Sequence, residues 1–280
     1  MGGHLVAGTL VLNGPASTPV LYMTNAGSLT FDKLDSDTAN KAFTLGDNAL
    51  LDGQLVIKEA AGSNISGAVG IGINQGIWNL LLGSGRALGT GTISAAGAGF
   101  VIQGSKDLTG ANAFSNDWVL NWNSGESALY TFSGSNSIAL NGTVTGSNNI
   151  NAPIINNISS GKTLTLTNVR INTGVNADKF ISIRGSGDTI ITGTVSNGNE
   201  ALIRGLTYTG TNGVNTNLGS LTLMGSNTYN GLTTVTAGTL RVGNNSALGT
   251  GTLVLNGGAL SASDSVTART PVSYTHLRAH

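Results

Sequence analysis

The chain has 280 residues, and Gly (42), Thr (34), Asn (31) and Ser (27) supply nearly half of them. Charged residues make up only 9% and the formal net charge is zero, so a clustered basic surface for nucleic acid is excluded. Cysteine is absent and no apolar run approaches the roughly 18 residues of a membrane helix, which excludes disulfides, Cys metal sites and a helical span.

The N-terminal segment predicts a β-strand. Residues 8–14 read GTLVLNG, in which apolar and polar residues alternate with a period of two before an Asn-Gly turn signal. No Lys or Arg precedes an apolar stretch here, so residues 1–14 do not read as a secretory signal. Because the chain begins inside a strand pattern, we expect it to be part of a longer protein.

An acidic segment follows at 31–52. Five of the 13 carboxylates fall within it: Asp32, Asp35, Asp37, Asp47 and Asp52. The run FDKLDSD could hold Ca²⁺ through its first three Asp residues, because hard cations require several oxygen ligands. It lacks the Gly turn and the terminal Glu of an EF-hand loop, so we favour a solvated insertion loop whose charge Lys33 and Lys41 balance. Residues 35–52 are also the one segment that could hold a short helix.

Three motifs in the middle of the chain invite a functional interpretation. SSGKT (159–163) resembles a phosphate-binding loop, but Asn156 replaces its first Gly and a strand pattern follows where a helix is needed, so we reject it. RGSGDTIITG (184–193) resembles one Ca²⁺-binding nonapeptide, yet such sites need tandem copies, and we predict an ordinary corner. Trp118 and Trp122 lie among Asn residues and could stack on sugar rings, but we favour a core position for Trp118, and also for Trp78.

Short motifs recur along the chain. GTLVLNG appears at 8–14 and at 251–257, and ALGTGT at 87–92 and 247–252. The separations are close to multiples of about 20 residues, which suits the coils of a solenoid. In such a fold Leu10, Leu12, Leu253 and Leu255 point inward, Gly and Asn occupy the corners, and Asn side chains stack between coils. A sandwich or barrel is the competing all-β fold, but motifs echoed over 250 residues argue against it.

The clearest motif covers residues 225–260, GSNTYNGLTTVTAGTLRVGNNSALGTGTLVLNGGAL. It closely resembles the autotransporter-associated β-strand repeat of bacterial passenger domains, in its GSNTYNG opening, GLTTV strand, ALGTGTL corner and NGGAL close. A degenerate copy lies at 62–93, and residues 1–14 resemble the end of a third. The resemblance is strong over about 36 residues, and between 94 and 218 only composition and strand style agree.

The resemblance implies an all-β fold, a right-handed parallel β-helix that forms a single elongated domain over residues 1–270. It also implies export to the bacterial cell surface or release from it. Members carry an N-terminal signal and often an outer-membrane barrel, which we expect in the full-length parent. Residues 271–280, by contrast, contain two of the three histidines and resemble a translated vector junction, so we predict a non-native tail.

We predict a structural, surface-display segment with an adhesive role and no catalysis. We predict no catalytic, cofactor-binding or metal-ligating residues and no cofactor. The fitting partners are a host or environmental glycan or a matrix protein, with no nucleic acid and no membrane insertion by this segment, and the full-length parent is expected to be a monomer. The alternative is a carbohydrate-active β-helix, a polysaccharide lyase or glycosidase. It requires acids such as Asp107, Asp117 or Glu126 to be paired beside a Trp, and a Ser-His-Asp triad would have to use His4.

Overall fold

A computed structural model describes residues 4–12, 19–21, 27–36, 41–45, 54–58, 65–71, 77–95, 99–121, 129–147, 152–173, 179–199, 201–211, 218–263 and 278–279. The chain divides into two compact units, residues 1–142 and 143–280, and the boundary falls within strand β12 (Ile138–Ser147).

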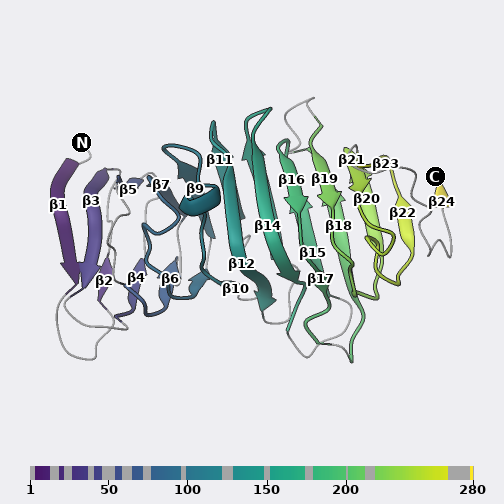
Figure 1. The fold of residues 1–280 in the computed structure, drawn as a ribbon, viewed down its shortest axis with the longest axis horizontal. Coiled ribbons are helices and arrows are strands. Elements are labelled where there is room, and N and C mark those ends of the chain that lie inside the picture. Colours follow the sequence, from purple (N-terminus) through teal and green to yellow (C-terminus); the bar gives the residue numbers. More distant parts are fainter. Residues whose placement is uncertain are drawn as a thin grey trace. The chain divides into compact units, whose positions relative to one another are not determined.

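In the first unit the chain alternates between two parallel sheets (Figure 1). One sheet has the order β1 (His4–Leu12), β3 (Ser28–Ser36), β5 (Gln54–Ile57), β7 (Trp78–Leu82), β9 (Gly99–Gly104) and β11 (Leu129–Gly134). The other has the order β2 (Val20–Leu21), β4 (Phe43–Leu45), β6 (Val69–Ile71), β8 (Ile93–Ala95) and β10 (Trp118–Asn121). Among the described residues one short 3₁₀ helix, η1 (Gly110–Asn112), interrupts this pattern.

The second unit repeats the arrangement. Its first sheet has the order β13 (Ala152–Ile158), β15 (Lys179–Arg184), β18 (Arg204–Thr209), β20 (Thr233–Ala237), β22 (Leu253–Leu255) and β24 (Arg278–Ala279). Its second sheet has the order β14 (Thr163–Arg170), β16 (Asp188–Ile191), β19 (Ser220–Leu223), β21 (Thr239–Val242) and β23 (Ala259–Ala262), and β17 (Val195–Ser196) pairs with β14.

Each strand therefore pairs in parallel with its equivalent in the next coil. This is the arrangement of a β-solenoid, and the predicted parallel β-helix is confirmed. The competing sandwich is wrong, because a sandwich is built from antiparallel neighbours. No described residue belongs to an α-helix.

The core is made of inward residues that stack from coil to coil. In the first unit Leu55, Leu80, Ile102 and Phe132 occupy equivalent positions on successive strands, and each is at most 2% exposed. The predicted inward positions agree in part. Leu253 is 3% exposed, whereas Leu255 is half-buried. Leu10 and Leu12 are also half-buried, and both line a cavity beside Leu34. Alternation with a period of two thus marks the buried face of these strands.

The repeated ALGTGT segments form the same corner in both units. The Thr90 N–H donates to the Ile65 carbonyl (2.8 Å), and the Thr250 N–H donates to the Tyr229 carbonyl (3.0 Å). The glycine before each Thr has a positive φ, 83° at Gly89 and 60° at Gly249. The second glycine of each segment, Gly91 or Gly251, touches the preceding coil, because a Cβ there would overlap the carbonyl oxygen of Gly67 or Gly231. The sequence repeat therefore encodes a close contact between coils.

Two expectations need correction. The helix proposed for 35–52 is wrong over the described part, because β3 continues to Ser36 and Phe43–Leu45 forms β4. Residues 37–40 and 46–53 lie outside the described residues. The coil length is also not a constant 20 residues. Thr233 pairs with Leu253, 20 residues further on, whereas Leu129 pairs with Gly99, 30 residues before it.

The predicted tail at 271–280 falls mostly outside the described part of the chain. Arg278–Ala279 forms the short strand β24, which pairs with Val254 and Leu255 of β22. The vector-junction interpretation of this tail stays a prediction.

Two positive-φ glycines test the contact between coils. A Cβ on Gly161 (φ 79°) meets nothing within 4 Å, whereas a Cβ on Gly249 (φ 60°) would overlap the Tyr229 carbonyl oxygen. We expect Gly161→Ala to cost about 1–2 kcal/mol, the backbone strain alone. Gly249→Ala should cost more than about 3 kcal/mol, because the coils must also separate. Urea unfolding followed by circular dichroism measures both, and equal losses would contradict the role assigned to the contact.

Candidate groove on the second unit

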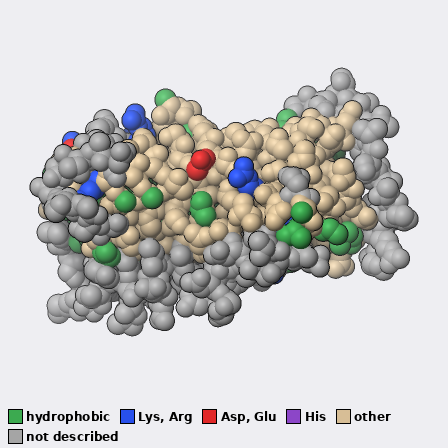
Figure 2. Space-filling view, turned by 90° about the horizontal axis from the view of Figure 1, so that it is seen from below, with side chains coloured by type: hydrophobic (Ala, Val, Ile, Leu, Met, Phe, Trp, Pro, Cys, Tyr) green, Lys and Arg blue, Asp and Glu red, His purple; other side chains and the backbone are tan. Residues whose placement is uncertain are grey.

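The surface offers few charges. Figure 2 shows one face of the molecule, where uncharged polar side chains and backbone predominate and Lys, Arg, Asp and Glu appear in only a few places. Within the described ranges no group of three or more His, Asp or Glu residues could hold a metal ion. No helix among these residues has the length and apolar character needed to cross a bilayer.

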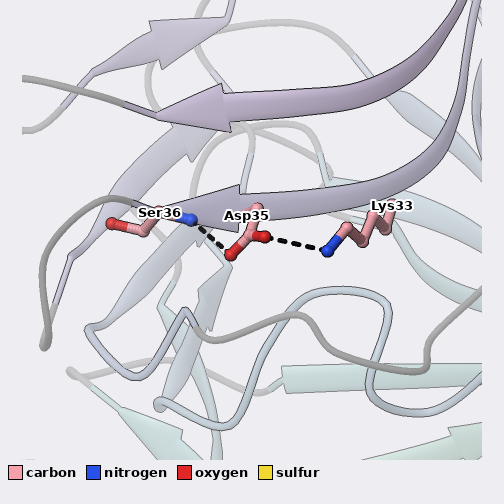
Figure 3. Close-up of polar contacts among 3 residues, drawn as sticks. All are labelled: Lys33, Asp35 and Ser36. Carbon is pink, nitrogen blue, oxygen red and sulfur yellow. Dashed lines mark hydrogen bonds and ion pairs between the residues drawn. The ribbon is translucent and has the colours of Figure 1, made fainter.

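The acidic run at 31–37 is strand rather than loop over its described part. Lys33 Nζ lies 2.9 Å from Asp35 Oδ2, and the Ser36 N–H donates to Asp35 Oδ1 at 2.9 Å (Figure 3). Asp32, also in β3, lies 3.6 Å from Lys58 Nζ. The predicted insertion loop is therefore wrong here, because both carboxylates stand on β3 beside cations.

These contacts also bear on the Ca²⁺ hypothesis. Lys33 balances Asp35 as expected. Lys41 is buried, with 6% of its surface exposed. Asp37, Asp47 and Asp52 lie outside the described residues. What the described part of the segment offers is two carboxylates, each already beside an ammonium group.

The phosphate-loop and nonapeptide motifs are corners. Ser159–Gly161 turns the chain, with the Lys162 N–H donating to the Ser159 carbonyl at 3.1 Å, and strand β14 follows. In 184–193 the carboxylate of Asp188 accepts hydrogen bonds from the backbone N–H (2.9 Å) and hydroxyl (2.7 Å) of Ser220 in the next coil. The structure thus has a turn followed by β14 at the first motif, and a corner followed by β16 at the second.

The tryptophans that the structure describes belong to the core. Trp78 and Trp118 are 0% exposed. Trp118 packs on Phe100 and Phe114 with ring centroids 5.6 and 5.4 Å apart, tilted and edge-to-face respectively, as aromatic pairs prefer. Stacking of Trp118 on a sugar is therefore ruled out, and its predicted core position is confirmed. Trp122 lies outside the described residues.

The remaining acid–base candidates are dispersed. Asp107 and Asp117 are exposed, and Asp107 accepts a hydrogen bond from the Ser137 N–H at 2.8 Å. His4 is the first residue of β1, and Glu126 is not among the described residues. Burial raises the pKa of Tyr130, Tyr208 and Tyr229 well above the ordinary value, so these phenols stay protonated and are poor proton donors at neutral pH.

The second unit carries a groove of about 400 Å³, which we call the β18 groove. It lies on the outer side of β15, β18 and the start of β20. Its lining residues are Lys179, Phe180, Ile203, Gly205, Thr207, Gly231, Leu232 and Thr234. Ile203 and Leu232 are 59% and 54% exposed, although both are large aliphatic residues.

The strand register explains the hollow. Phe180 pairs with Gly205, and Leu206 pairs with Thr233, so Leu232 follows Gly205 in the same outward row. The Leu206 N–H donates to the Leu232 carbonyl at 2.8 Å, which fixes this row. Because Gly205 has no side chain, the middle strand places none between Phe180 and Leu232, although Gly205 itself is buried.

The sequence did not single out this groove. Its residues come from three coils between 179 and 234, and each alone resembles an ordinary strand residue. One signal was present: RGLTYT (204–209) places Gly where the neighbouring strands carry a side chain.

A second cavity of about 190 Å³ lies in the first unit. Leu10, Leu12, Pro19, Val20, Leu21, Leu34 and Phe43 line it. These described lining residues are all apolar, so none of them offers a polar group to orient a ligand.

Comparison of the chain with protein-family models, with curated proteins and with solved structures finds no match. The resemblance of 225–260 to the autotransporter-associated repeat therefore stays a prediction.

The contacts of Asp35 predict its titration. Two hydrogen bonds lower the pKa of Asp35 below its ordinary value of 3.8. The larger effect comes from Lys33 and the smaller one from the Ser36 N–H. The stabilisation is therefore complete above pH 3.8 and is lost as the pH falls through the lower pKa of the folded state. We expect Lys33→Gln to raise the pKa of Asp35 in a carbon-detected NMR titration.

The matched control is Lys58→Gln, because Lys58 contacts Asp32 instead. The Lys58→Gln variant should leave the pKa of Asp35 unchanged. An equal shift in both variants would show that general surface charge, not the Lys33 contact, sets this pKa.

Proposed function

We propose that this chain is a structural segment of an exported bacterial passenger protein, which displays its outer surface at the cell surface or in the medium and serves adhesion without catalysis. The proposal joins the β-solenoid fold to the resemblance of 225–260 to the autotransporter-associated repeat. A fitting partner is a glycan or a matrix protein, and the full-length parent acts as a monomer.

One observation carries the proposal most directly. The ALGTGT corner recurs in both units with the same hydrogen bond to the preceding coil, from Thr90 to Ile65 and from Thr250 to Tyr229. The sequence is thus repeated at a position where coils must stack. That distribution suits a chain selected for building a scaffold.

The uncharged surface supports the same proposal. Half-buried outward positions on equivalent strands carry hydroxyl residues, as with the paired Thr207 and Thr234. Such a surface presents hydrogen-bonding groups without a strong field, which suits a stalk or display face in variable salt.

The carbohydrate-active alternative receives no support from the described residues. Glycosidase chemistry requires two carboxyl groups about 5–9 Å apart flanking a sugar. Asp107 and Asp117 are exposed, Asp107 accepts a hydrogen bond from the Ser137 N–H, and Trp118 next to Asp117 is buried in the core.

Surface labelling tests the proposal. Antibodies raised against the purified chain should bind intact bacteria that carry the gene, or detect the protein in their medium, and external protease should remove the cell-bound signal. A cytoplasmic protein probed in parallel controls for lysis. Detection only after the cells are broken would contradict display, and release of sugar fragments from polysaccharides by the purified chain would contradict a role without catalysis.

A further inference from the structure

The β18 groove has the width of one flat ring. Neighbouring strands lie about 4.8 Å apart. Phe180 and Leu232 flank Gly205 on consecutive strands, so their side chains stand about two strand spacings apart with bare backbone between them. A ring inserted above Gly205 would lie one spacing from Phe180, within the 4.5–7 Å range over which aromatic rings pack.

The gap is required by the contact between coils. A Cβ on Gly205 would come within 2.7 Å of the Leu232 carbonyl oxygen, and a Cβ on Gly231 would overlap the backbone of Arg204. Side chains are therefore excluded from both positions. Neither glycine can therefore contribute a side chain to the space between Phe180 and Leu232.

The walls favour an aromatic ring over a sugar. Phe180, Ile203 and Leu232 supply apolar surface, and the hydroxyls of Thr207 and Thr234 are the uncharged polar side chains of the lining. A pyranose carries hydroxyls around its whole edge, and those buried against Ile203 and Leu232 would lose water without gaining a partner. A phenyl or phenol ring matches apolar walls with a polar end.

One charge orients the ligand. Lys179 is the only charged residue among the described residues that line the groove, and it stands at the start of β15 next to Phe180. On a surface with so few charges, an ammonium group beside an apolar slot selects a carboxylate near the inserted ring.

We propose that the β18 groove binds an aromatic side chain, flanked by a carboxylate, on an extended segment of a protein partner. This inference rests on the proposed adhesive role and gives it a partner class, a protein with acidic and aromatic residues rather than a glycan. Phe180 and Leu232 hold the ring, Thr207 and Thr234 receive its polar edge, and Lys179 pairs with the carboxylate.

The test uses the whole chain and the acetylated, amidated tripeptide Glu-Tyr-Glu as the probe. We expect saturable NMR shifts centred on the backbone amides of Gly205, Thr207 and Gly231. The tripeptide Glu-Ala-Glu should cause none, because it lacks the ring. Glucuronic acid and maltose form the sugar arm, and stronger binding of either at the same amides would overturn the choice of a protein partner.

Variants distinguish binding in the β18 groove from nonspecific binding to other exposed apolar residues. Leu232→Ser removes one wall of the groove and should weaken binding of the Glu-Tyr-Glu tripeptide by about tenfold. The matched control is Leu218→Ser, since Leu218 is 61% exposed and outside the groove lining. It should leave affinity unchanged. Lys179→Gln should weaken binding about threefold and reduce its dependence on salt.

Each remaining outcome decides the inference. Equal losses in the two leucine variants, or absence of shifts at these amides in a chain whose amide spectrum shows it to be folded, would overturn it. Neither result touches the display proposal, which surface labelling decides separately.

Discussion

Parallel pairing between one coil and the next is the interaction on which the rest of this molecule depends. Each coil supplies the hydrogen-bond partners of its neighbour, so every position lies directly above its equivalent about 4.8 Å away. Like charges in such a column would repel, whereas hydroxyl and aliphatic side chains can repeat without cost. The 9% charged content follows from this geometry. Asp32 and Lys58 on neighbouring coils carry opposite charges, whereas Lys179 and Arg204 are like charges that pair on β15 and β18.

The corners meet the same constraint by different means. Backbone groups that leave the strand ladder must still find partners, and buried asparagines supply them. Asn156 donates to the Asp188 carbonyl of the next coil and accepts from the Ile158 N–H of its own, and Asn227 bonds with Val195 on one side and Ala247 on the other. The sequence predicts stacked asparagine amides, but these side chains bond to backbone instead. An amide has both a donor and an acceptor, so one residue can join two coils.

The sequence was sufficient for the fold and for the corners, because both depend on local patterns. Alternation marks the buried face of β5, and in β22 it marks Leu253. The two ALGTGT segments mark one turn geometry. It misled at 31–45, where clustered Asp and Lys suggested a loop and a helix. In the structure Lys33 and Asp35 sit two residues apart on β3, so that a strand carries the pair. Coil length was also out of reach, since loops between equivalent strands can grow without disturbing the pairing.

The β18 groove could not be predicted for a related reason. It depends on which residues of separate coils fall in one row, and the row is set by a register that varies with loop length. Once the register is known, the position of the groove can be explained by the close contact between neighbouring coils. The tight contact between coils excludes side chains at Gly205 and Gly231, and the residues beside them, Phe180 and Leu232, then become walls. A solenoid can therefore acquire a ligand site by changing the residues that border a structural glycine, because such a glycine already provides a bare floor.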